Sequence, residues 1–118
     1  MSLLLQSIDD VRNDIYLHIG SDVKNIRIKD IEGCCHASHL RIFRTPPVIW
    51  GDKSQIDATL SLLQESTGTY EYAYYHLISG VDFPLKSQEY IHSFLKIMVK
   101  NSFHLIRKSM IILITLMK

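Results

Sequence analysis

An apolar strand that ends abruptly in an acidic loop constrains this chain more than any other stretch. Residues 74–79 read Tyr-Tyr-His-Leu-Ile-Ser, and Gly80, Asp82 and Pro84 follow closely. This pattern predicts a buried β-strand that ends in a loop, with a helix beginning soon after. Ligands of open α/β folds bind where strands end, so Asp82 is a candidate site residue. Asp is also a common turn former, and bracing the turn is the alternative role.

Length, charge and cysteine content narrow the class of protein. The 118 residues suit one domain, and a net charge of +1 gives no electrostatic reason to expect nucleic acid as a partner. Cys34 and Cys35 are adjacent and cannot form an ordinary disulfide framework, so a reducing, intracellular setting is expected. The first residues show no signal peptide, and the longest apolar run, Met110 to Met117, is far shorter than the roughly 20 residues of a membrane span. We therefore expect a cytoplasmic protein, free or peripheral to the inner face of the membrane.

Helix and strand patterns alternate along the chain. The expected order is a helix over 3–11, strands over 15–19 and 40–43, a helix over 54–66, a strand over 70–79 and a helix from 87 onward. This order predicts an α/β fold. Because the opening helix feeds directly into a strand, the strand that would precede it is missing, and the chain is expected to begin in the middle of a fold. Residues 103–118 are apolar, with either helix or strand potential.

Other polar residues give weaker signals. Asp52 or Ser54 is the natural N-cap of the helix over 54–66, whose first N–H groups suit a phosphate or a sugar hydroxyl. Capping alone explains the same residues. Adjacent Cys34 and Cys35, followed by His36 and His39, match zinc spacings poorly, so an ordinary loop is the expected reading. We predict no metal site and assign no catalytic base, and the two strand histidines, His18 and His76, are expected to be core residues.

Three blocks of sequence, taken in their order along the chain, indicate a family resemblance. They are Asn13 to Ile19, Val48 to Ile56 with its Trp50-Gly51 pair, and His76 to Lys86 with Ser-Gly-Val-Asp-Phe-Pro-Leu. Together they resemble the core-2/I-branching β-1,6-N-acetylglucosaminyltransferases, glycosyltransferase family 14. The chain is similar to a truncated bacterial member. The resemblance covers about residues 3–94.

The resemblance implies a fold and an activity. The fold would be a partial GT-A-like (Rossmann-like) sandwich, a mixed but mostly parallel sheet flanked by helices. Residues 1–96 would form the N-terminal part of the domain, and residues 97–118 an apolar tail that departs from the family. The implied activity is inverting transfer of a GlcNAc-like or xylose-like sugar from a UDP-sugar to a glycan hydroxyl, without a metal cofactor. By position, Asp82, Trp50, Gly51 and Ser54 would border the nucleotide-sugar site.

Three departures from the family pattern qualify this picture. Gly20 stands where family members carry an Asp, and Asp22 could replace that Asp only if the turn is rearranged. The family's first strand is missing, as is the downstream half with its catalytic Glu and its diphosphate-binding Arg and Lys. We therefore expect a fragment with weak or no activity. The alternative is a non-catalytic interaction module that associates with a partner or its own copy through the apolar run Ile111 to Met117.

Overall fold

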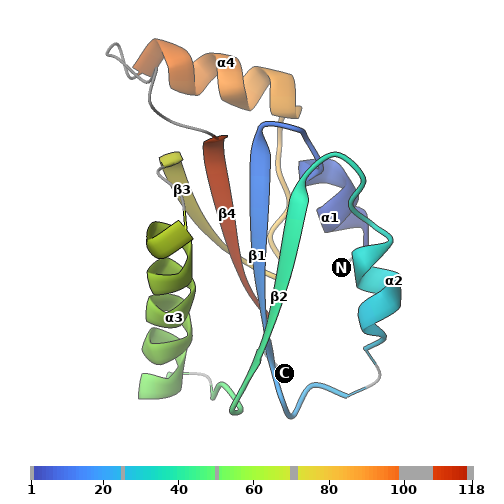
Figure 1. The fold of residues 1–118 in the computed structure, drawn as a ribbon, viewed down its shortest axis with the longest axis vertical. Helices are drawn as coiled ribbons and strands as arrows, with labels where there is room; N and C mark the ends of the chain where they lie inside the picture. Colours follow the sequence, from blue (N-terminus) through green and yellow to red (C-terminus); the bar gives the residue numbers. More distant parts are fainter. Residues whose placement is uncertain (1, 25, 50, 70–71, 99–107, 117–118) are drawn as a thin grey trace.

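A four-stranded sheet with all its strands parallel forms the centre of the molecule (Figure 1). The computed structural model describes residues 2–24, 26–49, 51–69, 72–98 and 108–116. In chain order the elements are α1 (Ser2–Ile8), β1 (Asn13–Gly20), α2 (Ile28–Glu32), β2 (His39–Thr45), α3 (Lys53–Thr69), β3 (Tyr72–Ser79), α4 (Gln88–Met98) and β4 (Lys108–Leu116). The predicted α/β class with flanking helices is confirmed. Within it, α2 lies in a stretch where the sequence pattern was too weak to predict an element.

Helices cover the sheet on both faces. Leu5 of α1, Ile31 of α2 and the partly buried Ile91 of α4 pack in one cluster with the odd-numbered residues of β1, such as Leu17. On the other face, Leu62 of α3 packs in a separate cluster that contains the side chains of Tyr16, Tyr72 and Leu113. Burial on both faces explains why β1 reads as a nearly continuous apolar run instead of an alternating one.

The C-terminal segment supplies an inner strand of this sheet. β4 lies between β1 and β3 and runs parallel to both, with Ile112 in register with Ile15 and His76. The side chains of Met110, Ile112, Leu113 and Ile114 are buried. The expectation of an exposed apolar run was therefore wrong for these residues. A strand that is covered on both faces has no polar side that would mark it as part of a fold. For this reason the segment was expected to be an apolar tail.

Within the run Ile111 to Met117, the side chains of Ile112, Leu113 and Ile114 are buried, and self-association through this run stays a prediction. Met117 itself lies outside the described residues. None of the helices in the described ranges is long and apolar enough to cross a membrane.

The crossover connections share one hand. Steps from β1 to β2 and from β3 to β4 go in the same direction across the sheet and pass through α2 and α4 on one face. The step back from β2 to β3 passes through α3 on the opposite face. A step from β4 to β1 through α1 would have this same hand, because α1 packs on the face of α2 and α4. β4 thus lies next to β1, on the side away from β2.

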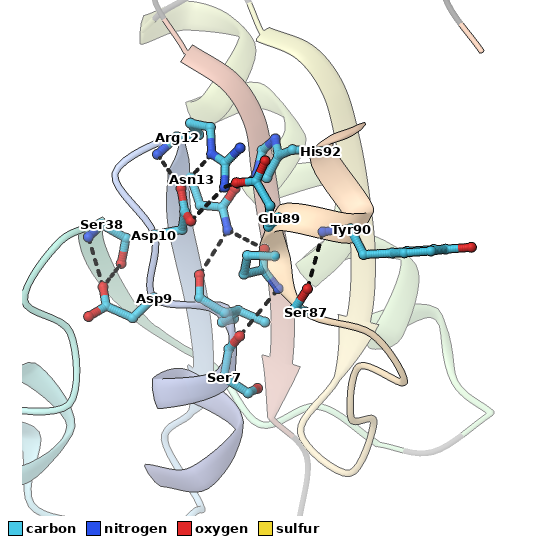
Figure 2. Close-up of polar contacts among 12 residues, drawn as sticks. Ser7, Asp9, Asp10, Arg12, Asn13, Ser38, Ser87, Glu89, Tyr90 and His92 are labelled. Carbon is cyan, nitrogen blue, oxygen red and sulfur yellow. Dashed lines mark hydrogen bonds and ion pairs between the residues drawn. The ribbon is translucent and has the colours of Figure 1, made fainter. Parts of the chain in front are cut away.

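Asn13 is the first residue of β1, although Asn13-Asp14 suggests a break in the sequence. Its side chain is fully buried: Nδ2 donates to the Ile8 carbonyl oxygen and to Gln88 Oε1, each at 2.8 Å, and Oδ1 lies 2.7 Å from His92 Nε2 (Figure 2). Asp14, also buried, accepts a 2.6 Å hydrogen bond from the Tyr72 hydroxyl. These partners replace water, so both polar residues are able to start a buried strand.

Candidate functional site

The strands all end at one edge of the sheet, the lower edge in Figure 1, because they are parallel. Three loops follow there, over residues 21–27, 46–52 and 80–87. These loops and the first turn of α3 carry all the predicted site residues. The carboxyl edge of a parallel sheet is where open α/β proteins bind their ligands.

Asp82 braces the turn that follows β3. Its Oδ2 accepts a 2.7 Å hydrogen bond from the Ser79 backbone N–H, and its own N–H donates to the Ser79 carbonyl oxygen at 3.2 Å. The turn-bracing role expected as the alternative is therefore confirmed. It does not exclude a second role, because Asp82 also lines a cavity.

This cavity lies between α3 and the end of β3 and has a volume of about 530 Å³. The described residues that line it are Gln55, Ile56, Thr59, Leu60, Leu77, Ile78, Ser79 and Asp82. Ile56, Leu60 and Leu77 are each at least half exposed, so its wall presents apolar surface to solvent. Its polar groups come from α3 and from the end of β3. We call it the α3–β3 cavity.

The loop before α3 is tied to the first turn of that helix. Asp52 is the N-cap: its Oδ2 accepts from the Ser54 backbone N–H at 3.2 Å, and hydrogen bonds from Ser54 hold the pKa of this exposed carboxyl below its usual value. Ser54 Oγ accepts from the Ile49 N–H at 2.8 Å. Gly51 has a φ of +76°, which favours glycine, and its N–H donates to Gln55 Oε1 at 2.9 Å.

These contacts settle the local role of Asp52 and Ser54 as that of a cap and a loop anchor. They also place Gly51 and Ser54 beside Gln55, which lines the α3–β3 cavity. Trp50, the remaining predicted residue of this loop, lies outside the described residues.

Asp22 lies where a side chain at position 20 would project. A Cβ atom added to Gly20 would be 2.8 Å from Asp22 Oδ1 and 3.5 Å from the backbone nitrogen of Val48. Asp22 Oδ1 is buried and has no hydrogen-bond partner among the described residues. The turn after β1 thus brings the Asp22 carboxylate close to the place that a side chain at residue 20 would occupy. The part that Asp22 takes in ligand binding stays a prediction.

The structure divides the predicted site residues into two groups. Asp82 shares the α3–β3 cavity with Gln55, whereas Asp22 lies beside the start of the loop 46–52. Sequence reasoning missed Gln55 and Thr59 as cavity residues. Their i, i+4 spacing on the helix that follows Ser54 places them on one face and was the available signal.

Several of the other histidines and cysteines that the structure describes are buried. His18 is fully buried, as expected, and burial lowers its pKa. The buried Cys34 donates from Sγ to the Asp30 carbonyl oxygen at 3.1 Å, while His36 and His39 are exposed. Among the residues that the structure describes, no three His, Cys, Asp or Glu side chains are grouped so as to hold a metal ion.

Together, these features define an α/β protein with a parallel sheet and a candidate ligand site at its carboxyl edge. Residues 1–110 match the family model described as Branch: Core-2/I-Branching enzyme. Since this match covers most of the chain, the protein belongs to that family, and its membership supports a glycosyltransferase-like function. Searches of curated proteins and of solved structures returned no significant match. The family match runs past residue 96 and into β4.

Proposed function

We propose that the protein binds a UDP-sugar in the α3–β3 cavity, with a GlcNAc-like or xylose-like sugar as the transferable group. The observation that carries this proposal is the position of Asp82, which lies in the turn after β3 and lines a cavity of about 530 Å³ at the carboxyl edge of the sheet. That volume falls within the roughly 300–1,000 Å³ of small-molecule sites. Membership in a glycosyltransferase family supports the choice of ligand class.

The residues of the cavity suit distinct parts of such a ligand. Asp82 uses Oδ2 for its turn, and in this proposal its Oδ1 accepts from a ribose or sugar hydroxyl. Ser79 and Thr59 add short hydroxyl side chains at the same cavity, while Leu60 and Leu77 provide an apolar wall for the face of the base or sugar ring. We expect the binding to be independent of metal.

Turnover is proposed to be weak or absent. Transfer with inversion needs a base at the acceptor hydroxyl and positive charge to stabilise the departing diphosphate. Among the described residues that line the cavity, Asp82 is the one carboxylate, and neither Lys nor Arg contributes. The cavity therefore suits binding of the donor better than acceleration of its reaction with a glycan acceptor.

The test is an NMR titration of the ¹⁵N-labelled full chain with UDP-GlcNAc, UDP-xylose and UDP, with CMP as the control nucleotide. We expect shifts of the backbone signals of residues 53–60 and 77–82 with the uridine ligands. Asp82→Asn should weaken UDP-sugar binding on the order of tenfold, because a hydrogen bond to a charged acceptor is lost. The matched control is Asp57→Asn, the same change at an exposed position of α3 that does not line the cavity.

Asparagine keeps an oxygen that can accept from the Ser79 N–H, so the turn should survive in Asp82→Asn. The proposal fails if millimolar UDP-sugar causes no shifts, or if the shifts map to another part of the protein. A parallel transfer assay tests the expectation of low turnover, and robust sugar transfer by the purified chain would refute it.

A further inference from the structure

A second cavity, of about 240 Å³, lies on the opposite side of β3 and is bordered by the loop between β3 and α4. Its described lining residues are Ile8, His76, Ile78, Asp82, Phe83, Pro84, Gln88, Ile91, Met110 and Ile112. They come from α1, β3, the loop 80–87, α4 and β4. The walls are mostly aliphatic or aromatic, and several of these residues belong to, or pack against, the main hydrophobic core.

Few polar groups are available to a molecule in this cavity. Both polar atoms of Gln88 are engaged, Oε1 by Asn13 Nδ2 and Nε2 by the Ser7 carbonyl oxygen. The half-buried imidazole of His76 has no hydrogen bond to another described residue, and its surroundings lower its pKa through burial. A neutral imidazole offers one donor and one acceptor. Asp82 adds a carboxylate at the same cavity.

We propose that this cavity binds a small, uncharged aromatic or branched aliphatic molecule that carries one hydroxyl group, with the hydroxyl at His76. Apolar walls with one or two polar groups are typical of sites for such ligands. An apolar protein cavity of about 150 Å³ has room for benzene, so the larger cavity admits a substituted ring. A ligand carboxylate is disfavoured by the like charge of Asp82, and an ammonium group would lose its hydration against apolar walls.

This site is distinct from the one proposed for the UDP-sugar. Ile78 and Asp82 line both cavities, but the other lining residues differ. His76 and Leu77 illustrate the separation: they are neighbours on β3, and each lines the cavity on its own side of the strand. Either ligand could therefore bind without the other.

The test compares three probes of the same shape: para-ethylphenol, ethylbenzene and para-ethylbenzoate. Each is titrated into the full chain with labelled isoleucine and methionine methyl groups. We expect shifts of the methyl signals of Ile8, Ile91, Met110 and Ile112. The phenol should bind about threefold to tenfold more tightly than ethylbenzene because of its additional hydrogen bond. The benzoate should bind most weakly.

Substitutions of His76 separate the hydroxyl contact from the apolar fit. His76→Leu should bring the affinity for the phenol down to that for ethylbenzene, whereas His76→Gln should retain part of the preference. The control, Leu77→Ala, should leave the order of the three probes unchanged. Amide spectra of each variant show whether it is folded, and UDP-sugar binding by His76→Leu reports separately on the α3–β3 cavity.

Three outcomes would overturn the proposal: no methyl shifts with millimolar para-ethylphenol, equal affinities for the phenol and the benzoate, or an undiminished preference for the phenol in folded His76→Leu. None of these results would bear on the UDP-sugar proposal, whose titration reports on a different set of residues.

Discussion

Asn13 shows how a single polar residue joins three elements of this fold. Its fully buried amide contacts the Ile8 carbonyl oxygen at the end of α1 and two side chains of α4, those of Gln88 and His92 (Figure 2). Near it, Arg12 pairs with Asp10 at 2.9 Å and with Glu89 of α4 at 3.2 Å. The buried amide is the stronger link to α4, because Glu89 is exposed and ion pairs to exposed side chains contribute little.

We predict that Asn13→Ala lowers the free energy of unfolding by about 2–4 kcal/mol. The substitution leaves Gln88 and His92 buried without their partner, and each unsatisfied group costs roughly 1–3 kcal/mol. Urea denaturation measures the loss. The control, Ser93→Ala at an exposed position of α4, should stay within about 0.5 kcal/mol of the unchanged protein. A loss below about 1 kcal/mol for Asn13→Ala would show that water replaces the amide.

His92 makes the stability depend on pH. Burial, and next the charge of Arg12, lower the pKa of its imidazole, and its Nε2 must carry hydrogen to donate to Asn13 Oδ1. The imidazole of His92 therefore takes up its second proton, the one that makes it cationic, at a lower pH in the folded protein than in the unfolded chain, where the His pKa is about 6.5. The stabilising contribution is complete above that value and is lost as the pH falls toward the pKa of the folded state.

We therefore predict that stability falls between about pH 7 and about pH 5, with a smaller slope in His92→Gln. The variant takes up one proton fewer when it unfolds. The slope of its free energy of unfolding against pH is therefore smaller by at most about 1.4 kcal/mol per pH unit. Burial also lowers the pKa of His18 and His76, so part of the slope should remain. Urea denaturation across this pH range measures the effect, and His36→Gln, at an exposed histidine, is the control. Equal slopes in His92→Gln and the unchanged protein would contradict the prediction.

At the scale of elements, the segment that leads into β2 is held by one carboxylate. Asp9, just after α1, accepts hydrogen bonds from the backbone N–H groups of His36, Ala37 and Ser38, at 2.8 to 3.2 Å, and from Ser38 Oγ at 2.7 Å. Burial by itself would raise the pKa of Asp9, but these hydrogen bonds outweigh it and lower the pKa. The carboxylate thus fixes where the chain turns into an edge strand.

We predict that Asp9→Ala loosens this segment before it affects the rest of the sheet. The N–H groups of residues 36–38 lose their acceptor, so their amide hydrogen exchange should become at least tenfold faster, while exchange within β1 follows only the change in global stability. Native-state hydrogen exchange measures both. The control is Asp30→Ala, at an exposed acid of α2. Equal acceleration at residues 36–38 in both variants would assign the protection to another contact.

At the scale of the whole molecule, stability depends on the strand that comes last in the chain. β4 is hydrogen-bonded to β1 and to β3, so among the described strands it is β4 that joins β3 to the rest of the sheet. Pairing of β4 with β1 spans almost the whole chain, and such non-local contacts form late because loop closure must come first. The C-terminal segment thus links β3 to β1.

Ile114→Ala should then lower the free energy of unfolding by about 2–5 kcal/mol, the usual cost of a large-to-small change in a core. Ile114 is fully buried on the face of α1 and α2. Ile97→Ala, at a position of α4 that is 72% exposed, is the matched control and should have little effect. Urea denaturation of both variants measures the difference. Equal, small effects would mean that β4 is a peripheral addition to a domain that is stable without it.

The amino-acid sequence by itself determined the local elements and the family. Apolar periodicity and turn residues are local signals, and they predicted the class of fold, the helix that Asp52 caps and the turn that Asp82 braces. Only the tertiary structure decided where the last strand lies and which residues share a cavity. An apolar run has the same composition whether it is an exposed tail or an inner strand, because its partners, β1 and β3, are distant in sequence. For the same reason the spacing of Gln55 and Thr59 places them on one face of α3, but only the tertiary structure shows that this face lines a cavity with Asp82.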